Sequence, residues 1–382
     1  MDRYRVLHSL NAARVCAEYC VVHYHVAPGG GFLKNDKMAS ALMSFFFVLS
    51  GFMAMHTNMD TDFSVAGAKW DYVSRRLQRT YPTYLIWILI DMPGNLMQHW
   101  QLANECPLFW VALASQPVLL QAWLGCFHTG ASNGVGWYLC TLFWLWFMFP
   151  FLPTRRLFSS WPRVKIACLY CASVLGFVAF SGLHPSNTRA LPILRAGEFL
   201  MGCCAALTLD TPVSGWLALL AVLGFAAFCG VSHALPWLWR FQDAQDVCRF
   251  WPTHKPEIDP TTLLSLFSPA WCVLIQWLAA TELSGGGGPV MSALQWGFFR
   301  SLSGFSLQLY LSHSVVGDGL RHLAAVLGLA DWWSADTLIL SLYLLAYLYS
   351  TQEQAALGWA GASARRAWRW LRPAPAPLEA CV

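Results

Sequence analysis

The chain has 382 residues, of which 57% are hydrophobic and 12% are charged, and its formal net charge is +4. A mean hydropathy of +0.45 exceeds what a water-soluble globule of this length needs, whereas a bilayer demands repeated apolar runs of about twenty residues. This composition excludes a soluble globular enzyme and predicts an all-α, polytopic, integral membrane protein. The charge excess is too small to predict a nucleic-acid partner.

The first apolar run, near residues 10–27, carries three polar groups that are costly inside a membrane: Arg14, Glu18 and His25. On a helix, Arg14 and His25 fall within about 20° of one face, and Glu18 lies about 40° from Arg14. The same helix separates Arg14 from His25 by roughly 16 Å along its axis. This stripe indicates a function, although a buried salt bridge and a satisfied histidine explain it equally well. We interpret the run as a signal-anchor.

Eleven apolar stretches follow one another along the chain. They lie near 10–27, 38–56, 81–100, 107–124, 135–152, 164–183, 190–209, 214–234, 262–281, 297–316 and 336–353. Lys and Arg gather in 1–14, 69–79, 155–165 and 365–372.

The positive-inside rule places all four basic clusters in the cytosol. Eleven crossings would put 155–165 outside, whereas all clusters agree if 107–124, which Pro117 interrupts, dips or lies flat. We therefore predict about ten transmembrane helices with both termini cytosolic. They form one domain over 1–353, followed by a basic cytosolic tail over 354–382.

The topology places residues 235–260 outside, as an ordinary loop or as a lid or acceptor surface. Cysteines such as Cys168 and Cys171 lie inside apolar runs, where cysteine behaves as a small hydrophobe, so we expect no metal site.

Arg76 and Arg79 lie three residues apart, on one helical face before Pro82. Paired guanidiniums suit phosphate recognition, although arginines there would anchor a cytosolic loop in any case.

Two further polar groups lie inside apolar spans. The Ser50-Gly51 pair predicts a close helix contact or an opening for a thin substrate chain. Arg195 and Glu198 are close enough along a helix to pair with each other.

Six short motifs occur in order along the chain. They are Leu10-Asn11-Ala12-Ala13-Arg14 with His25; Phe46-Phe47-Val48-Leu49-Ser50-Gly51-Phe52; Arg76 and Arg79 with Pro82; Trp137 with Leu139; Glu198-Phe199 with Gly202; and Ser306 with Tyr310, Leu311 and His313. In this order they resemble the acyltransferase 3 family of integral-membrane acyltransferases. Asn11, Ser44 and Leu142 replace the Asp, Asp and Glu of many relatives, which indicates a divergent branch.

The resemblance implies transfer of an acyl group, commonly acetyl, from cytosolic acyl-coenzyme A to a hydroxyl, frequently of a sugar, on the other side. Acyl-coenzyme A is then a co-substrate, and no tightly bound cofactor is expected. Arg76 and Arg79 are the implied phosphate ligands. Arg14 would hold the arm or the phosphates, and Ser50 would lie along the acyl arm.

The resemblance also implies that His25 is the general base that takes the proton of the acceptor hydroxyl, in a catalytic group with Arg14 and Glu18. A covalent acyl-enzyme is not required, and Ser50 is the first candidate for one. Acceptor orientation or oxyanion stabilisation would fall to Tyr310, His313, Trp137 and Glu198.

Two other classes remain open from the sequence. A ten-span transporter or permease accommodates the same buried charges. An inactive acyltransferase-like membrane partner is the third class, because Leu142 stands where many relatives have Glu.

Overall fold

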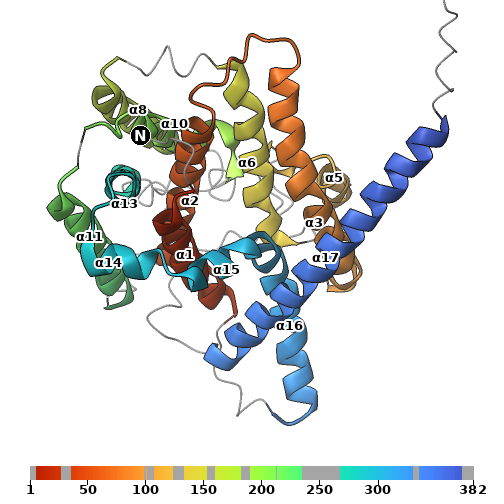
Figure 1. Cartoon of the computed structure of the whole chain (residues 1–382). Helices are drawn as coiled ribbons and strands as arrows, with labels where there is room; N and C mark the ends of the chain where they lie inside the picture. The colour runs from red at the N-terminus through yellow and green to blue at the C-terminus, as the bar shows by residue number, and fades with distance from the viewer. Residues whose placement is uncertain are drawn as a thin grey trace, which may run out of the picture.

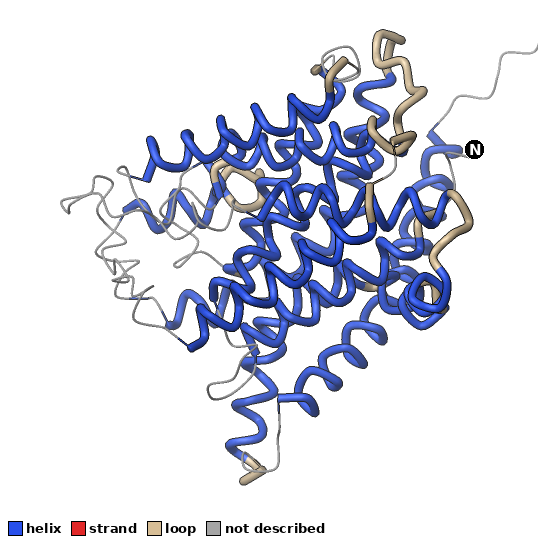
Figure 2. The backbone as a smooth tube through the Cα atoms, turned by 90° about the vertical axis from the view of Figure 1, so that its left-hand side faces the viewer, coloured by secondary structure: helices blue, strands red, loops and turns tan. Residues whose placement is uncertain are grey.

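The computed structural model describes residues 6–26, 36–98, 100, 107–123, 133–152, 160–181, 190–211, 213–234, 267–329 and 335–371. Within these ranges every regular element is a helix, which confirms the all-α prediction (Figure 2). The predicted outer segment 235–260, residues 1–5 and 155–159 of the basic clusters, and residues 372–382 of the tail lie outside the described residues.

The longer helices of the described residues pack side by side (Figure 1). They are α1 (His8–Val26), α2 (Asp36–Thr57), α3 (Ala68–Gln98), α6 (Trp137–Met148), α8 (Pro162–Ser181), α10 (Pro192–Ala206), α11 (Gly215–Ala234), α13 (Ser268–Leu283), α16 (Ser306–Val326) and α17 (Ala335–Leu371). The shorter elements are α5 (Pro107–Ser115), α14 (Gly288–Leu294), α15 (Gly297–Gly304), η1 (Gln121–Trp123), η2 (Gly134–Gly136) and η3 (Phe149–Phe151).

Helix α1 contacts α2, α13, α15, α16 and α17, so it lies at the centre of the described helices (Figure 1). A buried carboxylate fixes its start. The Glu282 side chain, at the end of α13, accepts hydrogen bonds from the backbone N–H groups of His8 (2.9 Å) and Ser9 (2.8 Å). A carboxylate satisfies the free N–H groups of a first helical turn and complements the helix dipole. The register of α1, and with it the depth of Arg14 and His25, is set by this cap.

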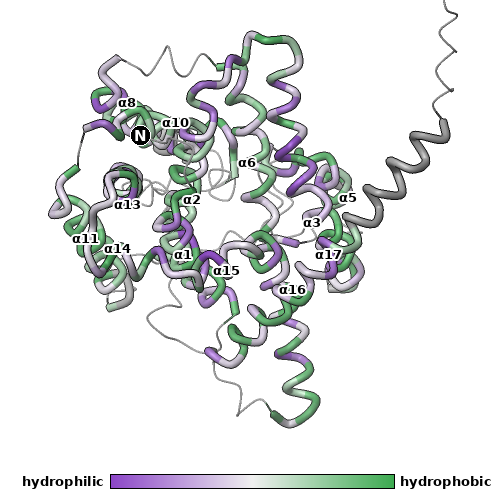
Figure 3. The backbone as a smooth tube through the Cα atoms, viewed as in Figure 1, coloured by the Kyte–Doolittle hydropathy of each residue, from purple (hydrophilic) through white to green (hydrophobic). Residues whose placement is uncertain are grey.

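Two described helical stretches, Met38–Thr57 and Gly134–Phe151, are long and apolar enough to cross a membrane, and Gly215–Val231 is apolar but shorter. Helix α11 is largely hydrophobic along its length (Figure 3). Its residues Leu217, Leu220 and Leu223 are each more than half exposed. An outward apolar face is typical of helices that contact lipid. The ten-span topology and the cytosolic termini stay predictions.

The predicted span 297–316 is wrong as a single helix. Helix α15 ends at Gly304, and α16 begins at Ser306 after a break at Phe305. Ser303 and Gly304 have low helix propensity, and hydropathy alone registers no break because the segment stays apolar. The motif from Ser306 to His313 therefore occupies the first turns of a new helix.

Two other segments differ in length from the predicted spans. Helix α5 has nine residues, which span about 14 Å and are too short for a hydrocarbon core of about 30 Å. This agrees with a segment 107–124 that does not cross. Helix α17 continues from the predicted span 336–353 to Leu371, across the predicted start of the tail.

Helices α2 and α10 touch through two glycines. A Cβ atom on Gly51 would lie 1.8 Å from the Phe199 carbonyl oxygen, and one on Gly202 would lie 1.9 Å from the Val48 carbonyl oxygen. The predicted close helix contact at Gly51 is confirmed. The glycines in two of the six motifs thus face the same interface.

The α2–α10 interface also buries an ion pair. Arg195 contacts the Glu198 carboxylate at 2.9 Å and 3.1 Å, and both side chains are buried, which confirms the predicted pairing. Glu198 also accepts hydrogen bonds from Ser44 (2.6 Å) and Ser268 (3.2 Å). Since a buried charge needs partners, this network ties α2, α10 and α13 together.

Candidate functional site

A cavity of about 480 Å³ lies between α1, α2, α3, α6 and α16. We call it the arginine cavity, and its polar lining includes Arg14, Glu18, Ser50, Arg76, Arg79 and Ser306. The four residues predicted to bind the acyl donor therefore share one cavity, although they come from three helices. Three guanidiniums against one carboxylate leave an excess of positive charge in the lining.

Two of these guanidiniums, those of Arg76 and Arg14, contact neighbouring groups that orient them. The Arg76 guanidinium lies over the Tyr72 ring at 4.1 Å and near the Trp146 ring at 5.4 Å. The Arg14 guanidinium donates to the Ser303 carbonyl oxygen at 2.6 Å. The Nε atoms of Arg14 and Arg76 are buried without a hydrogen-bond partner among the described residues. Both arginines are thus oriented by contacts with other described residues.

Glu18 is buried and is held by α16 rather than by Arg14. The Ser306 hydroxyl donates to one carboxylate oxygen at 2.6 Å, and the other oxygen has no hydrogen-bond partner in the described part of the chain. The salt bridges found between described residues do not include an Arg14–Glu18 pair. Ser303 and Ser306, on either side of the α15–α16 break, therefore hold Arg14 and Glu18 of α1.

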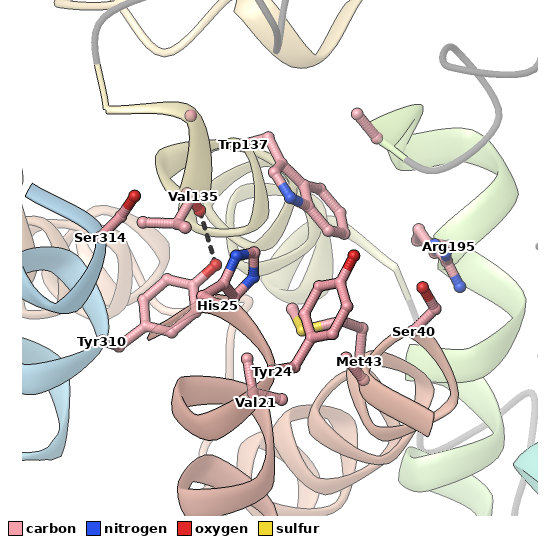
Figure 4. A pocket seen from close by; sticks show the side chains of 13 residues that line it. Val21, Tyr24, His25, Ser40, Met43, Val135, Trp137, Arg195, Tyr310 and Ser314 are labelled. Atoms are coloured by element: carbon pink, nitrogen blue, oxygen red, sulfur yellow. Dashed lines mark hydrogen bonds between the residues drawn. The ribbon is translucent and has the colours of Figure 1, made fainter. Parts of the chain in front are cut away.

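A second cavity, of about 310 Å³, lies near the far end of α1. We call it the histidine cavity, and Figure 4 shows His25, Tyr24, Trp137 and Tyr310 lining it. The exposed His25 ring contacts Tyr24 edge-on, with ring centroids 4.9 Å apart. Trp137 and Tyr24 give the cavity aromatic walls, which suit the apolar face of a ring-shaped molecule.

Tyr310 lines both cavities. Its hydroxyl donates to the Val135 carbonyl oxygen at 2.5 Å, drawn as a dashed line in Figure 4. Its ring meets the Tyr138 ring edge-on, with centroids 5.5 Å apart. Tyr310 thus lies in the lining of both cavities, next to the start of α6, where Trp137 lines the histidine cavity and Tyr138 the arginine cavity. We call this place the junction.

The other two predicted site residues line neither cavity. His313 is fully buried behind His25, with ring centroids 5.1 Å apart. Glu198 is buried in its ion pair, and it is Arg195 that reaches the histidine cavity. The predicted roles of all these residues stay predictions.

Sequence reasoning missed several residues that shape the site. Tyr72 lies four residues before Arg76, and this helical spacing is a signal for the stacking that the structure has. Tyr138, Trp146 and the Ser303 carbonyl come from other elements, and no local pattern predicts their contacts. The described residues contain no group of three or more His, Cys, Asp or Glu side chains that could hold a metal ion.

The family model described as an acyltransferase domain, that of the acyltransferase 3 family, matches residues 7–351. The match covers nearly the whole chain and confirms the resemblance carried by the six motifs. Comparisons with curated proteins and with solved structures gave no match.

Proposed function

Since the chain belongs to the acyltransferase 3 family, we propose that it moves an acyl group, most simply acetyl, from acyl-coenzyme A to a hydroxyl of a sugar or another small molecule. It does so as a multi-pass membrane enzyme. One observation carries the proposal: an arginine-rich cavity and a histidine-lined cavity share Tyr310 as a lining residue.

The arginine cavity suits the donor. Coenzyme A carries phosphates on a long, thin arm, and guanidiniums bind phosphate oxygens in a bidentate manner. The phosphates bind to Arg76 and Arg79 of α3 and to Arg14 of α1. The rest of the lining includes Phe46 and Leu49, which accommodate the apolar parts of the arm.

The histidine cavity suits the acceptor. The acceptor hydroxyl gives its proton to a His25 nitrogen as its oxygen attacks the thioester carbonyl carbon. The tetrahedral intermediate collapses, the carbon–sulfur bond breaks, and the His25 imidazolium returns the proton to the departing thiolate. Tyr310, at the junction, can donate its hydroxyl to the developing oxyanion when it leaves the Val135 carbonyl oxygen.

A transfer assay tests the proposal. Purified protein is mixed with radiolabelled acetyl-coenzyme A and a panel of hydroxyl-bearing acceptors, and we expect label on an acceptor. His25→Ala should lower turnover by ~10²–10⁴-fold, because a positioned base typically contributes that much. His23→Ala, two residues away on α1, is the matched control and should stay active.

Undiminished transfer by His25→Ala would show that His25 is not the base. Solute flux without thioester consumption would favour a transporter. Failure of the wild-type protein to bind coenzyme A would favour an inactive membrane partner.

A further inference from the structure

The His313 imidazole has an unused nitrogen next to His25. Its Nδ1 atom lies 2.7 Å from the Tyr310 carbonyl oxygen, one helical turn earlier on α16. A backbone carbonyl only accepts hydrogen bonds, so in the neutral ring Nδ1 carries the proton and Nε2 is the acceptor. Nε2 is buried and has no hydrogen-bond partner among the described residues.

Two rings contact the His313 ring within the described residues, and His25 lies nearer to it than Tyr310, whose ring centroid is 5.9 Å away. The His25 and His313 ring centroids are 5.1 Å apart, and the ring planes are inclined by 53°. At this separation, rotation of the exposed His25 ring about its χ2 torsion can bring one nitrogen to hydrogen-bonding distance of Nε2. A buried acceptor left without a partner is costly, and a bond from His25 would remove that cost.

We propose that His313 is a positioning residue for His25. Its Nε2 atom accepts a hydrogen bond from an N–H of His25 when the acceptor molecule occupies the histidine cavity. This bond fixes the tautomer of His25, so that its other nitrogen is unprotonated and faces the acceptor hydroxyl. In this arrangement His313 only accepts the hydrogen bond and takes no proton, while its Nδ1–H stays bonded to the Tyr310 carbonyl oxygen.

The arrangement follows the logic of a catalytic triad, in which a third group holds the histidine base in the productive tautomer. Here the third group is a neutral imidazole, and it is held in turn by the backbone of the residue at the junction of the cavities. The inference rests on the proposed base role of His25.

A purely structural histidine would use only its Nδ1 bond to Tyr310, so the two roles depend on different nitrogens. His313→Asn keeps an amide N–H near the position of Nδ1 and removes Nε2. His313→Gln places an amide oxygen near the position of Nε2. The exposed His322 of the same helix supplies the control His322→Asn.

Steady-state kinetics with acetyl-coenzyme A and the acceptor found above separate the roles. We expect His313→Asn to lower kcat by ~10–100-fold, in the range found when an orienting partner is lost, with the KM for acetyl-coenzyme A unchanged. His313→Gln should keep roughly a third or more of the wild-type kcat, because its amide oxygen can replace Nε2 as the hydrogen-bond acceptor for His25. His322→Asn should match the wild type.

Wild-type kcat in His313→Asn would overturn the inference. An inactive His313→Gln variant that is folded and as thermally stable as the wild type would also overturn it. If His313→Asn does not fold, the His313→Gln variant alone tests the inference. An inactive wild type would instead show that the proposed function is wrong, and the inference would fall with it. An active wild type, an inactive His25→Ala and an unaffected His313→Asn would contradict the inference alone.

Discussion

The Arg76 guanidinium lies over the Tyr72 ring, and this contact orients it within the lining of the arginine cavity. We predict that Arg76→Gln raises the KM for acetyl-coenzyme A by about tenfold or more, since charge-assisted hydrogen bonds contribute ~1.5–3 kcal/mol. The kcat should change little, because the residue binds the donor and does not act on the reacting carbonyl. Initial rates over a range of donor concentrations measure both constants.

The neighbouring Arg75 is the control for this substitution, because it is exposed and is not part of the cavity lining. Arg75→Gln should leave the KM unchanged. If the two variants behave alike, the effect comes from the general charge of the α3 surface, and Arg76 is not a specific ligand. Repeating the series with dephospho-coenzyme A identifies which phosphate Arg76 contacts, because the penalty shrinks when that phosphate is missing.

Spacing along one helix predicts which of its side chains touch each other. Contacts between side chains of different helices cannot be read from the sequence. The Arg195–Glu198 pair follows from a spacing of three, and Tyr72 could have been found from a spacing of four. The bond from Arg14 to the Ser303 carbonyl depends on where α15 ends. That end is a backbone feature of a segment that stays apolar.

The α2–α10 contact gives the sharpest prediction at the scale of elements. We predict that Gly202→Ala destabilises the protein by at least ~1–3 kcal/mol, because its Cβ would meet the rigid backbone at Val48 and Phe52. Thermal unfolding in detergent, followed by the loss of monodisperse protein on size-exclusion chromatography, measures the change.

Gly224→Ala provides the matched control. Gly224 also lies inside a helix, but a Cβ there has no neighbouring atom within 4 Å. Because Ala has the higher helix propensity, this variant should be as stable as the wild type or slightly more stable. Equal destabilisation by both substitutions would contradict the close α2–α10 packing.

Most helices could be predicted from apolar periodicity and length, but breaks inside apolar segments could not. Pro117 predicts an interruption in the segment 107–124, whereas no proline marks the break at Phe305. The consequence matters for the site, because Ser303 and Ser306 flank that break and bond to Arg14 and Glu18.

At the scale of the whole molecule, α1 connects the two cavities: Arg14 lines one and His25 the other. If the protein spans the membrane as predicted, the donor binds at the cytosolic end of this helix and the acceptor toward the outer end. The exposed linker at 285–288 is then cytosolic, and the segment 235–260 is outside.

Epitope insertion tests this topology. A short epitope inserted between Gly285 and Gly286, where the chain is exposed, should react with antibody only after cells are permeabilised. The same epitope inserted after Gln245 should react in intact cells. Equal accessibility of the two sites would contradict the predicted ten-span arrangement.

We propose that the acyl donor lies in the arginine cavity with its thioester at the Tyr310 junction, within reach of His25. A cryo-electron microscopy map of the His25→Ala variant with acetyl-coenzyme A tests it most directly, because this variant should bind the donor without consuming it. We predict phosphate density against Arg14, Arg76 and Arg79, and a thin arm that passes Ser50 toward Tyr310. Phosphate density in the histidine cavity, or an acyl group far from Tyr310, would contradict the claim.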